Sequence, residues 1–166
     1  MHTITAIALH PGGEYFAGQS SDNQICIYEN KGGNFRRIKS KKFASHYCAG
    51  YACAIDFSND GQFLISGDER GKIFFYDWKT SKTYRAIDAH PSICIGVEWH
   101  PNDPNSVASC GWEGLVKLWQ WLQYLDRISH NGSKISKVFF KLINKGKSVV
   151  FKKLNFYQIY NIMFID

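Results

Sequence analysis

The stretch that decides the fold runs from His90 to Trp119. Its first part reads Ile93-Cys94-Ile95-Gly96-Val97-Glu98-Trp99. The odd positions are large and apolar, whereas the even positions are small or polar, and this period of two is typical of a half-buried β-strand. Its second part contains Glu113-Gly114, which favours a tight turn because glycine tolerates a positive φ. We therefore expect strand, loop, strand, hairpin and strand.

The same pattern occurs three times along the chain. Three segments align without gaps: Ile7-Ala8-Leu9-His10-Pro11, Ile55-Asp56-Phe57-Ser58-Asn59 and Val97-Glu98-Trp99-His100-Pro101. The turns that follow are Asp22-Asn23, Arg70-Gly71 and Glu113-Gly114, and the closing residues are Tyr28, Tyr76 and Trp119. The anchors Leu9, Phe57 and Trp99 are 48 and 42 residues apart. A period in the forties with His before and Trp or Tyr after is the sequence sign of a β-propeller blade.

On these residues the chain resembles the WD-repeat family, whose units are four-stranded antiparallel blades. The resemblance implies an all-β fold, a partial propeller of about three blades in residues 1–119. Propellers typically have four to eight blades, so we interpret the chain as the last part of a propeller or a truncated product. An open arc leaves two blade faces exposed, and we expect marginal stability or association.

In this family a His, a Ser or Thr, an Asp and a Trp form a buried hydrogen-bond network, which fixes strand register. The third repeat has nearly the whole set, namely His90, Ser109, Glu113 and Trp119. The second has His46 and Ser66, with Arg70 where the acid is expected, and the first keeps Asp22. In an antiparallel meander the link into the first strand and the turn between the second and third strands lie at one end. His90 and Glu113 should therefore meet.

Two chemical alternatives involve these histidines, a hydrolytic triad at His90 and a zinc site at His46. His90, Ser109 and Glu113 have the residue types of a hydrolytic triad, but the chain has no nucleophile elbow and the repeat already accounts for their spacing. A zinc cluster of His46, Cys48 and Cys53 fits no familiar ligand spacing, and small buried cysteines are the favoured interpretation. We expect no enzyme activity, no cofactor and no small-molecule substrate.

The cysteine content and the hydropathy of the chain indicate the cellular compartment of the protein. The five cysteines are odd in number and include no Cys-x-x-Cys, which favours a reducing compartment. We also expect no signal peptide and no membrane span.

Loops at the end that carries the His links are candidates for partner binding, because a propeller binds through loops held on a rigid ring. The candidate residues are Trp112, Arg70, Glu69, Tyr47 and Pro91. A tryptophan in a turn suits an interface anchor. The alternative for Trp112 is packing on the neighbouring blade.

Residues 35–43 fit an outer strand, and five of the nine are cationic: Arg36, Arg37, Lys39, Lys41 and Lys42. Lysine and arginine on an outermost strand discourage edge-to-edge pairing, which is the favoured interpretation. The alternative is contact with RNA phosphates or an acidic partner.

Residues 120–166 differ from the rest. Residues 1–119 have equal numbers of cationic and acidic side chains, so the whole formal charge of +6 lies in this segment. It contains no repeat, and we predict an irregular tail, with a hairpin as an option across residues 134–154. One hypothesis is that it is translated non-coding sequence. The competing one is that it supplies the outer strand of the third blade or binds nucleic acid.

Several segments go beyond the generic repeat. They are Asp22-Asn23-Gln24-Ile25, Gly50-Tyr51-Ala52-Cys53, Ser66-Gly67-Asp68, Asp77-Trp78-Lys79-Thr80 and the run from Cys110 to Trp119. Together they resemble the C-terminal blades of the pre-mRNA-processing factor 17 family of splicing factors. The resemblance covers nearly all of residues 1–119 and none of 120–166. It implies a nuclear, non-catalytic scaffold that contacts spliceosomal proteins around the second catalytic step. The alternatives are another WD-repeat adaptor, such as a ubiquitin-ligase substrate receptor or a signalling scaffold, and a direct RNA binder.

Overall fold

The computed structural model describes residues 3–48, 50–125 and 136–143. These residues form three antiparallel sheets of four strands each. The first sheet contains β1 (Ile4–Leu9), β2 (Tyr15–Ser20), β3 (Gln24–Lys31) and β4 (Asn34–Ala44). The second contains β5 (Ile55–Phe57), β6 (Phe63–Gly67), β7 (Lys72–Asp77) and β8 (Thr83–Asp88). The third contains β9 (Cys94–Trp99), β10 (Ser106–Gly111), β11 (Val116–Leu125) and β12 (Ser136–Ile143). The prediction of an all-β fold with three four-stranded units is confirmed.

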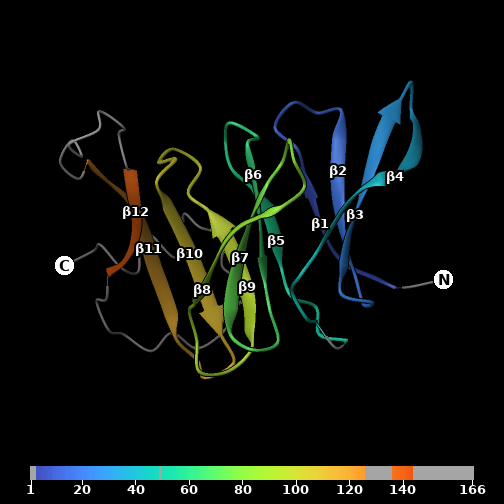
Figure 1. Cartoon of the computed structure of the whole chain (residues 1–166). Coiled ribbons are helices and arrows are strands. Elements are labelled where there is room, and N and C mark those ends of the chain that lie inside the picture. The colour runs from blue at the N-terminus through green and yellow to red at the C-terminus, as the bar shows by residue number, and fades with distance from the viewer. Residues whose placement is uncertain (1–2, 49, 126–135, 144–166) are drawn as a thin grey trace.

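The sheets stand side by side in chain order (Figure 1). Within each sheet the strands follow the order of the sequence, so each sheet is a meander joined by short turns. The first strand of each sheet lies at the inner edge, and β5 contacts both β1 and β9. The three apolar runs found in the sequence therefore line the common axis of the stack.

Large side chains of one sheet pack against small ones of its neighbour. Ile55 and Phe57 are buried in a cluster between the first two sheets, against which Ala6 and Ala8 of β1 pack. Val97 and Trp99 lie in a second cluster, against which Ala54 packs. Such complementarity lets two pleated faces approach closely and fill the space between them. It is the packing that the alternation of large and small residues predicts.

Polar contacts also join the inner strands. The carboxylate of Asp56 accepts hydrogen bonds from the backbone N–H groups of Trp99 (2.7 Å) and Phe57 (2.8 Å). The N–H of Ala54 donates to the carbonyl of Ile95 at 2.8 Å. Burial raises the pKa of Asp56 to about 6, although the two N–H donors oppose that shift. The second and third sheets are thus held in one register.

The outer strand β4 lies where the sequence predicts it, and β8 holds the same outer position in the second sheet, whereas the third sheet differs from expectation. Strand β11 continues past Trp119 to Leu125, and β12 pairs with it along its length, with Trp119 opposite Leu142. The structure agrees here with the outer-strand interpretation of the C-terminal segment. The third sheet therefore extends past residue 119, where the repeat pattern ends. Residues 148–154 of the optional hairpin lie outside the described part.

The physical reason for this difference is that the outer edge of β11 needs hydrogen-bond partners, which a strand outside the repeat pattern can supply. Strand β11 would otherwise present a row of unpaired backbone groups at the sheet edge. Residues 136–143 include Val138, Phe139 and Phe140, residue types that favour strands. Pairing of this kind needs strand propensity but no repeat motif. A search for the repeat pattern therefore does not find β12.

Substitution of Gly67 tests the close approach of the second and third sheets. A Cβ at this position would lie 2.1 Å from the carbonyl oxygen of Cys94. We expect Gly67→Ala to lower the free energy of unfolding by about 1–3 kcal/mol, because the backbone must move apart. Urea titration followed by circular dichroism measures this change.

Gly18, on the second strand of the first sheet, provides the matched control. A Cβ there meets only the side chains of Ile4 and Tyr28, at 3.2 and 3.3 Å, which are free to shift. Gly18→Ala should cost clearly less than Gly67→Ala, and an equal or larger cost would contradict the packing described here.

Candidate interaction surface

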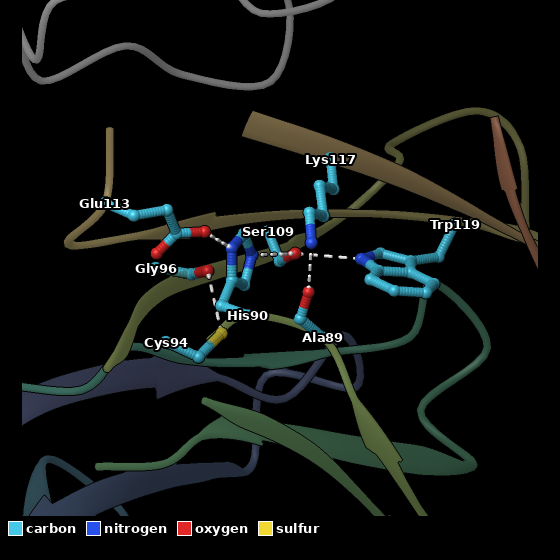
Figure 2. Close-up of polar contacts among 8 residues, drawn as sticks. All are labelled: Ala89, His90, Cys94, Gly96, Ser109, Glu113, Lys117 and Trp119. Carbon is cyan, nitrogen blue, oxygen red and sulfur yellow. Dashed lines mark hydrogen bonds and ion pairs between the residues drawn. The ribbon is translucent and has the colours of Figure 1, made fainter. Parts of the chain in front are cut away.

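A chain of hydrogen bonds crosses the third sheet at the end where β9 begins. The indole N–H of Trp119 donates to Oγ of Ser109 at 2.8 Å. That oxygen lies 2.8 Å from Nε2 of His90, whose Nδ1 contacts the carboxylate of Glu113. Figure 2 shows the four side chains in a line from the Glu113 turn to the Trp119 strand. Residues separated by up to 23 positions are brought together.

The order of donors fixes the protonation of His90. A carboxylate only accepts hydrogen bonds, so Nδ1 of His90 carries the proton and Nε2 accepts the hydroxyl proton of Ser109. Burial lowers the pKa of His90, while the bond to Glu113 acts in the opposite direction. Every polar atom along the line from Trp119 to Nδ1 has a partner, which is the condition for keeping such groups buried.

The links into the second and third sheets and the turns between the middle strands of these sheets meet at the same rim. The N–H of Glu69 donates to the carbonyl of Tyr47 (2.7 Å), and the N–H of Cys94 donates to the carbonyl of Asp68 (3.0 Å). The N–H of Trp112 donates to the carbonyl of Ile93 at 3.0 Å. These backbone bonds join the links and the turns into one continuous surface, which we call the link rim.

A search against known protein families identifies the fold. The pattern described as "WD domain, G-beta repeat" matches residues 1–29, 38–77 and 81–120. The chain belongs to the WD40-repeat family. Each sheet is accordingly one WD40 blade.

Curated relatives share this repeat region. Pre-mRNA-processing factor 17 of Homo sapiens is 49% identical over 119 residues, which are 72% of this chain and 20% of the relative. The Saccharomyces cerevisiae protein of the same name is 34% identical over 116 residues, 69% of this chain and 25% of the relative. WD repeat-containing protein 25 of Mus musculus is 25% identical over 118 residues, 71% and 22% of the two chains. The chain thus spans a fifth to a quarter of the length of these relatives.

The second WD40 blade also has a buried hydrogen-bond network around its histidine, but different residues form it. Nδ1 of His46 lies 2.8 Å from the hydroxyl of Tyr76, which stands where Trp119 stands in the third blade. Nε2 of His46 lies 2.7 Å from Nε2 of Gln19, a fully buried residue of the first blade. Ser66 instead donates to the carbonyl of Gly67 at 2.8 Å. The network of the second blade therefore reaches across to its neighbour.

Asp68 is the acid that the sequence comparison missed. It is fully buried, and its carboxylate accepts hydrogen bonds from the N–H groups of Tyr47 (2.8 Å) and Arg70 (2.5 Å). It lies two positions before Arg70, where the aligned repeat would place the acid. An aspartate in the run Ser66-Gly67-Asp68, directly before a turn, is a signal that would have indicated this turn-stabilising role.

The first blade contacts the second through the turn between β2 and β3. Asp22 accepts a hydrogen bond from the side-chain amide of Gln24 at 3.3 Å. The adjacent Asn23, with φ of 64°, accepts one at 2.7 Å from the N–H of Cys48 in the link to the second blade. Asn23 therefore makes a contact between the first two blades at this turn.

Aromatic side chains are exposed along the link rim. Trp112 is 57% exposed. Its ring makes an edge contact with Tyr51 in the link between β4 and β5, with ring centroids 5.0 Å apart. The guanidinium of Arg70 lies 3.9 Å from the ring centre of Tyr47, which is 43% exposed. Trp112 thus touches the neighbouring blade and still presents more than half of its surface, while its role in partner binding stays a prediction. Pro91 is exposed on the same rim, and Glu69 is half-buried there.

The cations of β4 do not form one set. Arg36, Arg37, Lys39 and Lys42 are exposed. Lys41 is the exception, because its ammonium lies 4.1 Å from the ring centre of Trp78 and donates to the Trp78 carbonyl. Burial lowers the pKa of Lys41, and the nearby Asp77 partly offsets the shift. Lys41 therefore joins the first two blades.

The geometry bears on the chemical alternatives. His90, Ser109 and Glu113 have the connectivity of a hydrolytic triad, but Ser109 is 3% exposed and its oxygen already accepts the Trp119 N–H. Cys48 and Cys53 are fully buried. Among the described residues, no group of three His, Cys, Asp or Glu side chains is arranged to hold a metal ion. Nor does this part of the chain contain a helix that is long and apolar enough to cross a membrane.

Removal of the Ser109 hydroxyl tests the network of the third blade. We expect Ser109→Ala to lower the free energy of unfolding by about 1–3 kcal/mol, because it leaves the Trp119 N–H and Nε2 of His90 buried without partners. Ser66→Ala is the matched control, since that hydroxyl bonds only an adjacent carbonyl. An equal loss in the two variants, measured by urea titration, would show that the network adds nothing specific.

The pH dependence of stability tests the neutral state of His90. Its pKa in the folded chain is below the ordinary value of 6.5. The unfolded chain therefore takes up the proton first, and the stabilisation present above pH 6.5 is lost as the pH falls through the folded pKa. We expect the stability difference between the wild type and His90→Gln to shrink from about pH 7.5 to about pH 5.5.

Comparison of the two proteins at each pH cancels the other titrating groups, Asp56 included. A difference in unfolding free energy that stays constant over this range would mean that His90 does not titrate in the way described.

Proposed function

We propose that this chain is a non-catalytic WD-repeat scaffold of pre-mRNA splicing, which works in the nucleus through protein–protein contacts around the second catalytic step. The similarity to pre-mRNA-processing factor 17 supports the setting. The link rim supports the mode of action. Its loops are held by buried hydrogen bonds, and such loops bind partners without paying a large ordering cost.

The observation that carries the contact role is the exposure of Trp112. A half-exposed indole on a rigid turn is the kind of residue that dominates binding energy at interfaces. Tyr47 and Arg70 extend the same surface with one aromatic ring and one cation, both residue types that are enriched at interfaces. Their stacking fixes the ring and the guanidinium before a partner arrives.

A protein without catalytic activity also fits the chemistry of the third blade. The hydroxyl of Ser109 is enclosed and serves as a link between Trp119 and His90. A nucleophile needs access to a substrate atom at about 3 Å. Ser109 is 3% exposed and lacks that access.

Replacement of Trp112 tests the proposal. The full chain carrying an affinity tag is purified from nuclear extract, and the small nuclear RNAs that accompany it are quantified. We expect Trp112→Ala to reduce their recovery strongly, because loss of an interface anchor typically costs about 2 kcal/mol or more. Its effect on the unfolding free energy should be about 1 kcal/mol, since one edge contact with Tyr51 is lost.

Leu115→Ala is the control on the same hairpin, where Leu115 is 40% exposed. It should leave recovery of the RNAs unchanged. Lowered stability of Trp112→Ala with full recovery would refute the contact role. Absence of small nuclear RNAs from the wild-type sample would instead favour another WD-repeat adaptor.

A second candidate function is direct RNA contact through β4. The observation that favours it is the exposure of Arg36, Arg37, Lys39 and Lys42 along one outer strand. Each phosphate contact changes the slope of log affinity against log salt by about 0.7 for single strands. Replacement of all four by Gln should reduce that slope by up to about 3 units, as measured by fluorescence anisotropy with a labelled RNA.

Lys79 and Lys82 serve as the control, because both are exposed cations of the β7–β8 turn and do not belong to β4. Their replacement by Gln should leave most of the salt dependence. An unchanged slope in the quadruple variant would leave edge protection as the role of the β4 cations.

A further inference from the structure

A cavity opens between the second and third blades at the end opposite the link rim. Its volume is about 220 Å³. It lies where the β5–β6 turn and the β9–β10 loop face each other, and its walls include Asp60, Gln62, Phe63, Trp99, Asn105 and Trp121. Small-molecule sites usually measure about 300–1,000 Å³. A space of this size suits one side chain of a partner better than a whole metabolite.

Aromatic rings form one side of the cavity. Phe63 and Trp99 are nearly parallel, with centroids 6.4 Å apart, and Trp121 lies 5.4 Å from Phe63 at a tilt of 54°. Trp99 is fixed because its indole N–H donates to the carbonyl of Pro104 at 3.0 Å. Tyr84 stacks on Trp121 with a centroid distance of 5.5 Å. The rings are therefore held in place before any ligand enters.

Trp121 owes its position to the part of β11 that continues beyond the repeat. The family pattern ends at residue 120. The N–H of Trp121 donates to the carbonyl of Asn105 at 2.7 Å, which fixes the strand against the β9–β10 loop. The cavity is thus a feature of the extended third blade and not of the WD40 repeat itself.

Asp60 gives the cavity its charge. Among the described residues that line the cavity, it is the only charged one. Its Oδ1 accepts hydrogen bonds from the hydroxyl of Ser58 (2.6 Å) and the N–H of Gln62 (3.0 Å), which fix the carboxylate. In the described part of the chain no Lys or Arg forms an ion pair with it. At these described residues an anion such as a phosphate would meet one negative charge and no positive one.

We propose that this cavity binds an arginine side chain of a partner protein. A guanidinium is planar, stacks on aromatic faces and donates several hydrogen bonds in one plane. The rings of Phe63 and Trp121 offer the stacking faces, the Asp60 carboxylate accepts the charge-assisted bonds, and the amide oxygens of Gln62 and Asn105 are further acceptors. This inference goes beyond the proposed function and does not depend on splicing, because it concerns a different rim and a simple peptide probes it.

The test is a titration of the full chain with the peptide acetyl-Gly-Arg-Gly-amide, followed by NMR of the tryptophan indole N–H groups. We expect the signals of Trp121 and Trp99 to shift in a saturable manner. The same peptide with citrulline, a neutral side chain of the same shape, should bind about three- to tenfold more weakly. A lysine peptide should also bind more weakly, because an ammonium does not stack.

Two substitutions with matched controls complete the design. Asp60→Asn keeps the acceptor oxygen but removes the charge, and it should weaken arginine binding about three- to tenfold while leaving citrulline binding unchanged. Glu14→Gln makes the same change of charge at the exposed β1–β2 turn and should have no effect. Trp121→Leu should weaken binding, whereas Trp112→Leu on the link rim should not.

Three outcomes would overturn the proposal. They are equal binding of the arginine and citrulline peptides, unchanged binding in Asp60→Asn, and saturable shifts confined to tryptophans other than Trp99 and Trp121. Because the measurement involves no splicing protein, its failure would leave the proposed function intact, and the reverse also holds.

Discussion

The structure depends on the close approach of neighbouring sheets along their inner strands. Each sheet is apolar on the face that it turns to the next, so each must be covered by the next. Ala6, Ala8 and Ala54 are small enough for the large side chains of the following sheet to pack against them. Gly67 allows the Cys94 carbonyl to approach where any side chain would collide. The same requirement leaves the first sheet open on its other side, where Ile7 and Leu9 of β1 are 72% and 67% exposed.

Close packing of this kind brings buried polar groups with it, and the blades satisfy them in different ways. In the third blade the network is contained in one sheet and runs from Trp119 to Glu113. In the second, His46 uses Tyr76 of its own blade and Gln19 of the preceding one. The acid of that turn, Asp68, bonds backbone N–H groups and not the histidine. In both blades the buried histidine has partners at both ring nitrogens, which lowers the cost of keeping it in the interior.

The two ends of the stack offer different chemistry as a result. The link rim carries exposed aromatic rings and a stacked arginine over a buried polar network, which suits contact with a protein surface. The opposite end carries a small aromatic cavity with a single carboxylate, which suits a cationic side chain. A rigid stack of blades lets one short chain hold two such surfaces apart.

The three repeats with their inner strands, the outer strand β4 and the residues of the third-blade network can all be predicted from the amino-acid sequence. Those features follow from local periodicity and from spacing within one repeat, which are written along the chain. Tertiary structure decided which residues meet across the blades: Asp68 in place of the expected acid, Gln19 beneath His46, Lys41 on Trp78, and β12 beside β11. Gln19 and Lys41 have no local signature of these contacts, while the turn signal at Asp68 and the strand propensity of residues 136–143 do not specify a partner. A buried group or an unpaired strand edge takes whichever partner the neighbouring sheet brings within reach, and that choice exists only once the sheets are packed.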